Sequence, residues 1–308
     1  GKWTGSFILD QKNVNQITTY LDDQESLGEL QELFSNKNKS FQGSVVLGKG
    51  FVIEPIKAKE LIIDDPKNKE ILFPFLNGSD VNNEVNQNAR RWIINFFDWK
   101  KDKASKFSSC FKIIEETVKP ERAKVKRKTY RDNYWQYAEK GVNLYKVISS
   151  QKRTIVVPLI SKHTVFCFQN INQVFSNKLG VIASESNSEY AVLMSTIHHE
   201  WAWKNSTTMG SSTLNYVTSI AYEKYPFPNL LKSKLNELLD DLGSTYVSQQ
   251  TALTDLLQLG LTDLYNQFHN KDLVQKVQPI EAKSFEKKFG KETWNLYNHL
   301  EVKKAGNV

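Results

Sequence analysis

Apolar residues recur along this chain with two different spacings, which indicates a mixture of helices and strands. Four segments carry apolar side chains at about every third or fourth position and predict helices: residues 11–36, 58–63, 120–149 and 188–203. Four others are rich in β-branched and aromatic residues and predict strands with their turns: residues 43–53, 91–97, 154–168 and 180–183. The pattern therefore predicts an α+β fold, in which a mixed, twisted β-sheet is packed against helices.

The two prolines of Tyr225-Pro226-Phe227-Pro228 mark the predicted end of this part, because proline interrupts helices and central strands. Beyond them, residues 229–260 and 281–300 return to a helical spacing. We predict three regions: a helical connector over residues 1–38, the α+β domain over 39–228, and a helical C-terminal segment over 229–308. The chain begins Gly1-Lys2-Trp3 without Met, so we expect it to be a fragment of a longer protein.

The composition is that of a globular protein with a substantial core. The chain has 308 residues, is 40% hydrophobic and includes 17 Phe, 12 Tyr and 7 Trp, which argues against a disordered tail. Its two cysteines, Cys110 and Cys167, are too far apart for a CxxC metal site and suit a reducing cytoplasm. No apolar run approaches the roughly 18 residues of a membrane span, so we expect a cytoplasmic protein that does not contact a membrane.

Motifs for an enzyme active site are weak. Gly48-Lys49-Gly50 has neither the GxGxxG nor the Walker pattern, so we interpret it as a turn. His198-His199-Glu200 does not match a zinc protease, because adjacent helical residues point about 100° apart and cannot share an ion. Glu301-x-Lys303 is similar to the ExK motif of restriction nucleases, and a free-standing nuclease stays open as a hypothesis on that motif alone.

Positive charge is concentrated in one stretch of the chain. The formal net charge is +7, a mild excess that favours polyanionic partners. Seven basic residues and a single acid, Glu121, give one segment a charge of +6: Lys119, Arg122, Lys124, Lys126, Arg127, Lys128 and Arg131. We predict that this segment, together with Lys162, contacts DNA phosphates. The alternative is a surface helix that is basic without a specific partner.

A second candidate is the polar segment from Lys204 to Asn215, which we interpret as a loop. It is rich in short side chains that donate and accept hydrogen bonds. Asn pairs well with adenine, and Ser or Thr can take either role at a base edge. We therefore name Lys204, Asn205, Thr213 and Asn215 as candidate base-recognition residues, the alternative being an ordinary solvated loop.

Several segments together resemble one protein family. They occur in this order: Lys39-Ser40-Phe41-Gln42-Gly43, Phe73-Pro74-Phe75-Leu76-Asn77-Gly78-Ser79-Asp80, Arg91-Trp92-Ile93-Ile94-Asn95-Phe96, Val118-Lys119-Pro120-Glu121-Arg122, Arg131-Asp132-Asn133-Tyr134-Trp135, Ser161-Lys162-His163, Tyr225-Pro226-Phe227-Pro228, and Gly260-Leu261-Thr262 to Tyr265-Asn266-Gln267-Phe268-His269. The ordered set resembles the C-terminal target-recognition region of MmeI-like (type IIG/IIL) adenine-N6 DNA methyltransferases, which is related to that of BREX phage-defence methyltransferases. The match covers roughly residues 39–270.

The resemblance implies a parent protein of a restriction–modification or phage-defence system, whose upstream domain uses S-adenosylmethionine to methylate adenine N6. This chain lacks the Asn/Asp-Pro-Pro-aromatic motif of that domain, so we expect it to hold no cofactor, to be inactive alone, and to partner double-stranded DNA and the missing methyltransferase domain. In the family, base-reading residues precede an aromatic-x-x-Ser segment, here Tyr216 to Ser219, which points to Thr213 and Asn215. The alternative is a protein–protein docking module of a defence complex, for which Trp201 and Trp203 are candidates.

Overall fold

The computed structural model describes residues 5–17, 23, 30–210, 212–228, 233–269 and 287. The chain forms two compact units, Gly1–Glu32 and Leu33–Val308. In the first unit, strands β1 (Phe7–Leu9) and β2 (Lys12–Val14) pair antiparallel around a two-residue turn. The turn residues, Asp10 and Gln11, have φ of 49° and 64°, the left-handed conformation that tight hairpins require.

This hairpin shows that the predicted helix over residues 11–36 is wrong at its start. At the other end of that range the structure has a single 3-10 turn, Phe34–Asn36. Residues 18–22 and 24–29, which make up most of the middle of the range, lie outside the described residues.

The first sheet of the second unit has the strand order β10-β5-β6-β4. Its strands are β4 (Val52–Ile53), β5 (Leu72–Leu76), β6 (Arg91–Ile94) and β10 (Val174–Phe175). Pairing is antiparallel except between β5 and β10. The helices and turns around it are the 3-10 turn Lys49–Phe51, α1 (Pro55–Asp64), the 3-10 turn Pro66–Glu70, α3 (Lys101–Ala104) and α4 (Ser108–Ala123). The predicted strand over residues 91–97 and the predicted helix over residues 58–63 are confirmed by β6 and α1.

The second sheet is fully antiparallel, with the order β3-β11-β7-β9. Its strands are β3 (Ser40–Gln42), β7 (Arg153–Pro158), β9 (Cys167–Asn170) and β11 (Leu179–Ile182). The run Ile155-Val156-Val157 is buried throughout, because both faces of β7 are covered, and such strands carry continuous apolar runs. The strands predicted over residues 154–168 and 180–183 are confirmed here.

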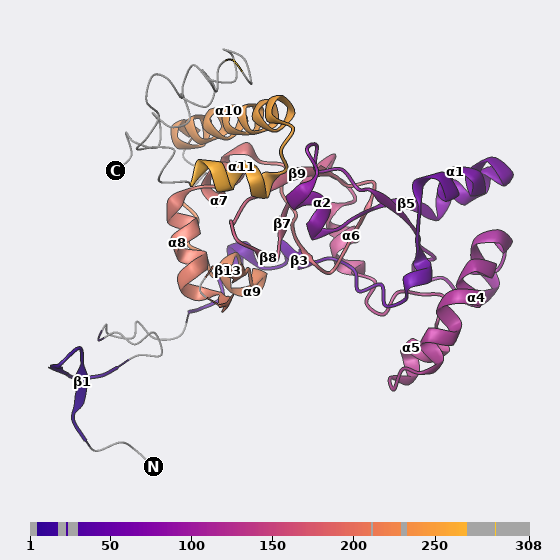
Figure 1. Cartoon of the computed structure of the whole chain (residues 1–308), viewed down its shortest axis with the longest axis horizontal. Helices are drawn as coiled ribbons and strands as arrows, with labels where there is room; N and C mark the ends of the chain where they lie inside the picture. The colour runs from indigo at the N-terminus through magenta and orange to yellow at the C-terminus, as the bar shows by residue number, and fades with distance from the viewer. Residues whose placement is uncertain are drawn as a thin grey trace. The chain divides into compact units, whose positions relative to one another are not determined.

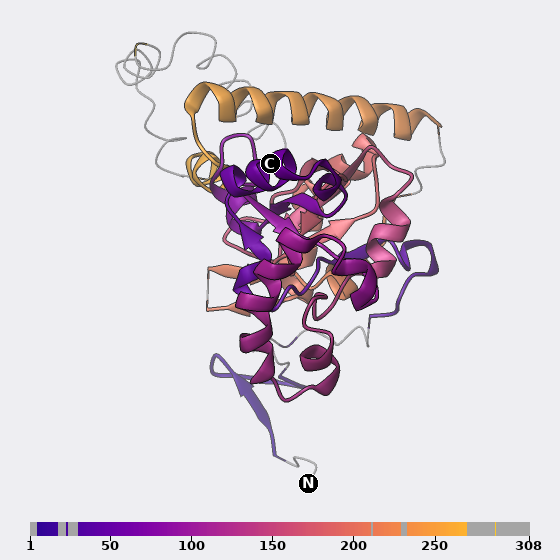
Figure 2. The same cartoon turned by 90° about the vertical axis from the view of Figure 1, so that its right-hand side faces the viewer.

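Helices after Pro228 share a core with the second sheet. Helix α10 (Ser233–Leu257) packs along α7 (Asn187–Leu193), and α11 (Leu261–Phe268) follows it (Figures 1 and 2). Leu253 and Leu264 lie in the same apolar cluster as Val156 and Val181 of the sheet. The helical period predicted for residues 229–260 is confirmed over α10, whereas residues 281–300 lie outside the described residues apart from 287. No helix in the described ranges combines the length and apolar character that crossing a membrane requires.

A third, smaller sheet has the order β12-β13-β8. It consists of β8 (Ile160–Ser161), β12 (Thr207–Met209) and β13 (Thr213–Asn215), with α8 (Thr196–Asn205) before it and α9 (Thr218–Ala221) after it. The segment predicted as a polar loop is therefore mainly a hairpin, with Gly210 at φ +67° in its turn. The helix predicted over residues 188–203 is two helices, because the Ser195 hydroxyl accepts from the backbone N–H of His198 and starts α8 anew.

The single helix predicted over residues 120–149 is also wrong. Helix α4 continues through Pro120 only to Ala123, and α5 (Lys128–Asp132) and α6 (Val142–Ile148) follow as separate short helices. Between them, Tyr134, Trp135 and Tyr137 are all buried in the core of the first sheet. These three side chains enter the core from the irregular segment between α5 and α6, where the single helix was predicted to continue.

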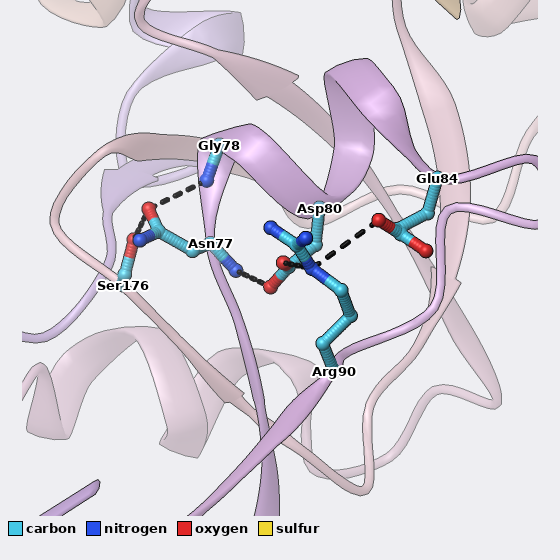
Figure 3. A network of polar contacts seen from close by, with 6 residues as sticks. All are labelled: Asn77, Gly78, Asp80, Glu84, Arg90 and Ser176. Atoms are coloured by element: carbon cyan, nitrogen blue, oxygen red, sulfur yellow. Dashed lines mark hydrogen bonds and ion pairs between the residues drawn. The ribbon is translucent and has the colours of Figure 1, made fainter. Parts of the chain in front are cut away.

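A polar network fixes helix α2 (Gly78–Asn83) where the first sheet meets the second (Figure 3). The fully buried Asp80 carboxylate accepts from the Asn77 backbone N–H at 2.9 Å and from Arg90 Nε at 3.0 Å. Asn77 Oδ1 accepts from the Gly78 N–H at 2.7 Å and from Ser176 Oγ at 3.0 Å. Asn77 ends β5, and Ser176 joins β10 of the first sheet to β11 of the second, so we call these residues, with Glu84, the joint network.

Replacing Asp80 by Ala is expected to lower the free energy of unfolding by about 2 kcal/mol, because it leaves the Asn77 N–H without its acceptor and removes the capping box of α2. Urea denaturation measures this loss. Glu84→Ala is the matched control, since it removes the other carboxylate on Arg90, at 3.2 Å, from a partly exposed site, and its effect should be much smaller. Equal losses from the two variants would contradict the assignment.

Candidate nucleic-acid interface

One face of the third sheet is exposed and carries mainly polar side chains, beside Met209 and Ile160, which are 58% and 44% exposed. Leu214 of β13 is buried, so its neighbours Thr213 and Asn215 point to the opposite face, since side chains alternate along a strand. The register pairs Thr207 with Asn215 and Met209 with Thr213. On the other side of β13, Asn215 pairs with Ile160 and Leu214 with Ser161, which brings Lys162 level with Thr213. We call Thr207, Met209, Thr213, Asn215 and Lys162 the ribbon face.

Three of the predicted contact residues thus come together, from two separate segments of the chain. Asn215 Nδ2 donates to Thr207 Oγ1 at 2.9 Å, which orients the Asn215 carboxamide across the hairpin. Lys162, predicted as a phosphate contact, lies with Thr213 and Asn215 and not with the basic segment. Sequence reasoning missed Thr207 and Met209, although a short Gly-containing stretch between two Thr-bearing runs is a hairpin signal.

The remaining two base-recognition candidates lie at the end of α8. Asn205 Nδ2 donates to the Trp201 carbonyl at 2.9 Å, one turn earlier in the same helix. Its amide therefore completes the helix end, and it is less available to a base edge than that of Asn215. Lys204 is exposed at the same helix end, next to the ribbon face in sequence.

Arg122 does not belong to the exposed basic surface. It is 1% exposed, and its guanidinium donates to four carbonyls, those of Leu47 (2.6 Å), Val46 (3.1 Å), Tyr130 (2.9 Å) and Gln136 (2.9 Å). Burial lowers the pKa of Arg122 from its ordinary value. This is a correction to the predicted phosphate contact: the side chain is consumed in holding the segment after α4 against the first sheet.

The six other basic residues of the segment fall into two groups. Lys119 lies 3.7 Å from Glu115, Arg127 lies 3.2 Å from Glu139, and Arg131 lies 3.8 Å from Asp132. Within the described ranges, no carboxylate forms an ion pair with the other three, all exposed: Lys124, Lys126 and Lys128. We call these three the lysine cluster, because their charge is not neutralised locally.

The lysine cluster and the ribbon face lie on different sides of the second unit. Figure 1 shows α4 and α5 at its right and α8 with β13 at its left, with the two larger sheets between them. The lysine cluster is attached to the core of the first sheet, whereas the third sheet is attached through Leu214 and Tyr216 to the cluster of Ile155, Val157 and Ile182. Of the predicted phosphate contacts, the structure therefore brings Lys162 next to the predicted base contacts on β13, but not the basic segment 119–131.

His198 of α8 has a structural role. His198 is fully buried, its Nε2 lies 3.0 Å from the Tyr216 hydroxyl, and its ring packs edge-on against Tyr225 at 4.6 Å. Burial, with a smaller repulsion from His199, lowers the pKa of His198 to about 3. Within the described part of the chain, no group of three or more His, Cys, Asp or Glu side chains is arranged to hold a metal ion.

Other candidate reactive or docking side chains are also directed inward. Burial raises the pKa of both Cys110 and Cys167 to about 12, so both stay protonated, inert thiols. The Trp201 ring packs against Tyr225 at 5.6 Å, and Trp203 packs against the core beside the third sheet. The two tryptophans therefore serve mainly to anchor α8 and offer little free surface for a partner.

Comparison with known proteins places this arrangement in a known class. The family model described as "MmeI, target recognition domain" matches residues 29–229. A solved structure of the type IIL restriction–modification enzyme MmeI in complex with DNA is similar, with a TM-score of 0.63 and 15% sequence identity. The alignment covers 93% of this chain and 36% of that one, so the chain spans about a third of the enzyme's length. Among curated proteins no match was found. The predicted family resemblance and the α+β fold are both confirmed.

The stability of the protein is expected to fall as pH drops from 7 to 5. The unfolded chain binds a proton at His198 below about pH 6.5, whereas the folded protein does not bind it there until about pH 3. Protonation therefore favours the unfolded state over this window. Urea denaturation at both pH values measures the drop, and His198→Gln should reduce it; an unchanged drop in that variant would contradict the role of His198.

Proposed function

The chain belongs to the family of MmeI target recognition domains, and on that premise we propose that it selects a specific sequence in double-stranded DNA for a site-specific adenine-N6 methyltransferase. The observation that carries this proposal is the ribbon face, in which Thr207, Thr213 and Asn215 of a short antiparallel hairpin lie beside the exposed Met209 and Lys162. The major groove of DNA is wide enough to admit a two-stranded β-ribbon, and its edges differ among all four base pairs.

The ribbon face suits direct contact with base edges. Asn215 offers a carboxamide that can pair with adenine, and the Thr213 hydroxyl can donate or accept. The methyl groups of Thr207 and Met209 can contact the methyl group of thymine. Lys162 adds a donor at the same level as Thr213 and suits the guanine acceptors O6 and N7. We therefore propose Lys162 as a base contact in place of the phosphate contact predicted from the sequence.

The lysine cluster supports affinity without sequence preference. An ammonium group that has no carboxylate partner gives up little when it approaches a phosphate, and it releases condensed counterions from the DNA. Lys119, Arg127 and Arg131 would each have to exchange an existing carboxylate partner. Because the cluster lies away from the ribbon face, we propose that it contacts the backbone at a different part of the duplex from the bases that are read.

The rest of the proposed activity resides outside this chain. We propose that the parent protein carries an S-adenosylmethionine-dependent domain that methylates adenine in a restriction–modification or phage-defence system in the cytoplasm. That reaction requires the target base to leave the helical stack, which costs a few kcal/mol. DNA contacts made by this region are a source of that energy, and the region itself needs no cofactor.

A docking module is the second candidate function. One exposed stripe on α10 favours it, because Leu235, Leu238 and Leu242 follow a helical spacing and are 36%, 62% and 47% exposed. A binding experiment with the purified methyltransferase region in the absence of DNA distinguishes the two functions. Tight DNA-free association together with no affinity for DNA would favour docking as the sole role.

The triple variant Lys124→Ala, Lys126→Ala, Lys128→Ala is expected to weaken binding to all duplex sequences alike. The slope of log affinity against log salt concentration should become shallower by about 2.7, at about 0.9 per phosphate contact. Fluorescence anisotropy in a salt titration measures both effects. Lys112→Ala is the matched control, since Lys112 lies on α4 and pairs with Glu116. Wild-type protein without affinity for DNA at low salt would refute the proposed function.

Asn215→Ala is expected to change which sequence is preferred while leaving the salt slope intact. A good contact to a base edge is worth about 1–3 kcal/mol of discrimination, which is roughly 5- to 150-fold in affinity. Selection from a randomised duplex pool measures the preference at each base pair. Thr208→Ala is the control, because Thr208 lies on the same hairpin with its side chain on the opposite face. The assignment fails if both variants leave the preference unchanged.

A further inference from the structure

Helix α11 reaches the ribbon face through one side chain. Asn266 Oδ1 accepts from Lys162 Nζ at 2.8 Å and lies 3.0 Å from His163 Nε2. The ammonium group can only donate, so the Asn266 atom that faces it is the carbonyl oxygen. One oxygen on α11 therefore holds two consecutive side chains that follow β8, although they are more than a hundred residues away in sequence.

Helix α11, which carries Asn266, is anchored in the core. Leu261, Leu264 and Tyr265 of α11 are buried in the core of the second sheet. The Tyr265 hydroxyl lies 2.6 Å from that of Tyr246 and accepts from Gln250 Nε2 at 3.0 Å, which ties α11 to α10. The position of Asn266 is thus set by the packing of the opposite side of its helix, and it does not depend on the position of Lys162.

His163 is the second residue that contacts Asn266. It is 8% exposed, and its ring stacks on His269 of the same C-terminal region at 4.9 Å, with planes 14° apart. Burial lowers the pKa of His163, which favours a neutral ring near pH 7. The tautomer that carries its proton on Nε2 donates to Asn266 Oδ1. This second bond fixes the orientation of the Asn266 carboxamide, and with it the position where the ammonium group of Lys162 is held.

A fixed lysine differs from a free one in what it can distinguish. A lysine side chain loses rotamer entropy when it is immobilised, whereas a mobile ammonium group adapts to any nearby acceptor. With Asn266 Oδ1 occupying one of its three donors, Lys162 keeps two that are directed from a defined point at the level of Thr213. Two donors in a defined place match the paired acceptors O6 and N7 of guanine.

We propose that Asn266 is a positioning residue for sequence recognition, which holds Lys162 so that the ribbon face discriminates at one base pair. The inference rests on the proposed function, because it assumes that the ribbon face contacts DNA. It gives the C-terminal helix a role in base selection in addition to its part in the core.

The test compares four variants of the whole chain with the wild type: Asn266→Ala, Asn266→Asp, Lys162→Met and Gln267→Ala. Selection from a randomised duplex pool gives the preference at each base pair, a salt titration gives the electrostatic slope, and thermal melting gives stability. Gln267 is the matched control, since it is exposed on the same helix next to Asn266.

Lys162→Met is expected to reduce discrimination at one base pair by at least about fivefold. Asn266→Ala should reduce it at the same base pair, with no further loss when the two changes are combined. Asn266→Asp keeps the acceptor and should keep the preference, even if its added negative charge weakens binding to all sequences. Gln267→Ala should behave as the wild type does.

The outcomes separate this inference from the proposed function. If the wild type shows no sequence preference, the proposed function fails as well. If the wild type is selective but Asn266→Ala leaves its preference unchanged, only the positioning role is overturned. It is also overturned if Asn266→Ala weakens all sequences equally while lowering the melting temperature, since that is the signature of a purely structural bond. A Lys162→Met variant that changes the salt slope alone would make Lys162 a phosphate contact and refute the inference.

Discussion

The arrangement of the second unit depends on one buried carboxylate, that of Asp80. It accepts from the Asn77 backbone and from Arg90 with no exposure of its own, so removing it would leave the partly buried Asn77 N–H without its acceptor. Through Asn77, the same network reaches Ser176, where the chain passes from the first sheet to the second. The lysine cluster belongs to the first of these sheets, and the ribbon face is attached to the second. The geometry of this joint therefore sets how a duplex would meet the two surfaces.

The two surfaces differ in how firmly their position is specified. Arg122 secures the segment that bears the lysine cluster, since it joins the carbonyls of Val46 and Leu47 to those of Tyr130 and Gln136. A buried arginine that is satisfied by carbonyls alone keeps its charge, and so adds to the positive potential around the three exposed lysines. Long, flexible lysines on a secured backbone suit phosphates, which need charge at the right distance more than a fixed angle. Base edges need fixed donors and acceptors, and the short polar side chains of Thr207, Thr213 and Asn215 are suited to that requirement.

The spacing of apolar residues predicted those elements in which buried side chains follow the regular geometry of one helix or strand. Strand β7 has a continuous apolar run because both its faces are covered, and α1 has one apolar stripe, so both were predictable. The segment after Ala123 departs from that geometry, because Tyr134, Trp135 and Tyr137 enter one core from an irregular backbone. The hairpin of the first unit depends on the left-handed conformation of Asp10 and Gln11, which neither residue type demands. The break at Ser195 was visible in principle as a helix-capping residue, but the apolar pattern continues across it.

The distribution of charge along the sequence was likewise an incomplete guide to the candidate site. Counting basic residues located a segment of high positive charge, but it could not show which of those cations have hydrogen-bond or ion-pair partners within the protein. Arg122 is satisfied by carbonyls, and Lys119, Arg127 and Arg131 have carboxylate partners. The three residues of the lysine cluster have none among the residues that the structure describes. Lys162 could be assigned to the ribbon face only after the pairing of β8 with β13 was known. The contact of Lys162 with Asn266 joins residues 104 apart, and no local pattern encodes such a pair. Local sequence pattern thus identifies the charged and polar side chains that are present. The long-range pairing of strands and helices determines which of these side chains are exposed together on one surface. On β13 the buried Leu214 provides the contact with the core, so we expect substitutions of the outward residues Thr213 and Asn215 to cost less stability than a substitution of Leu214.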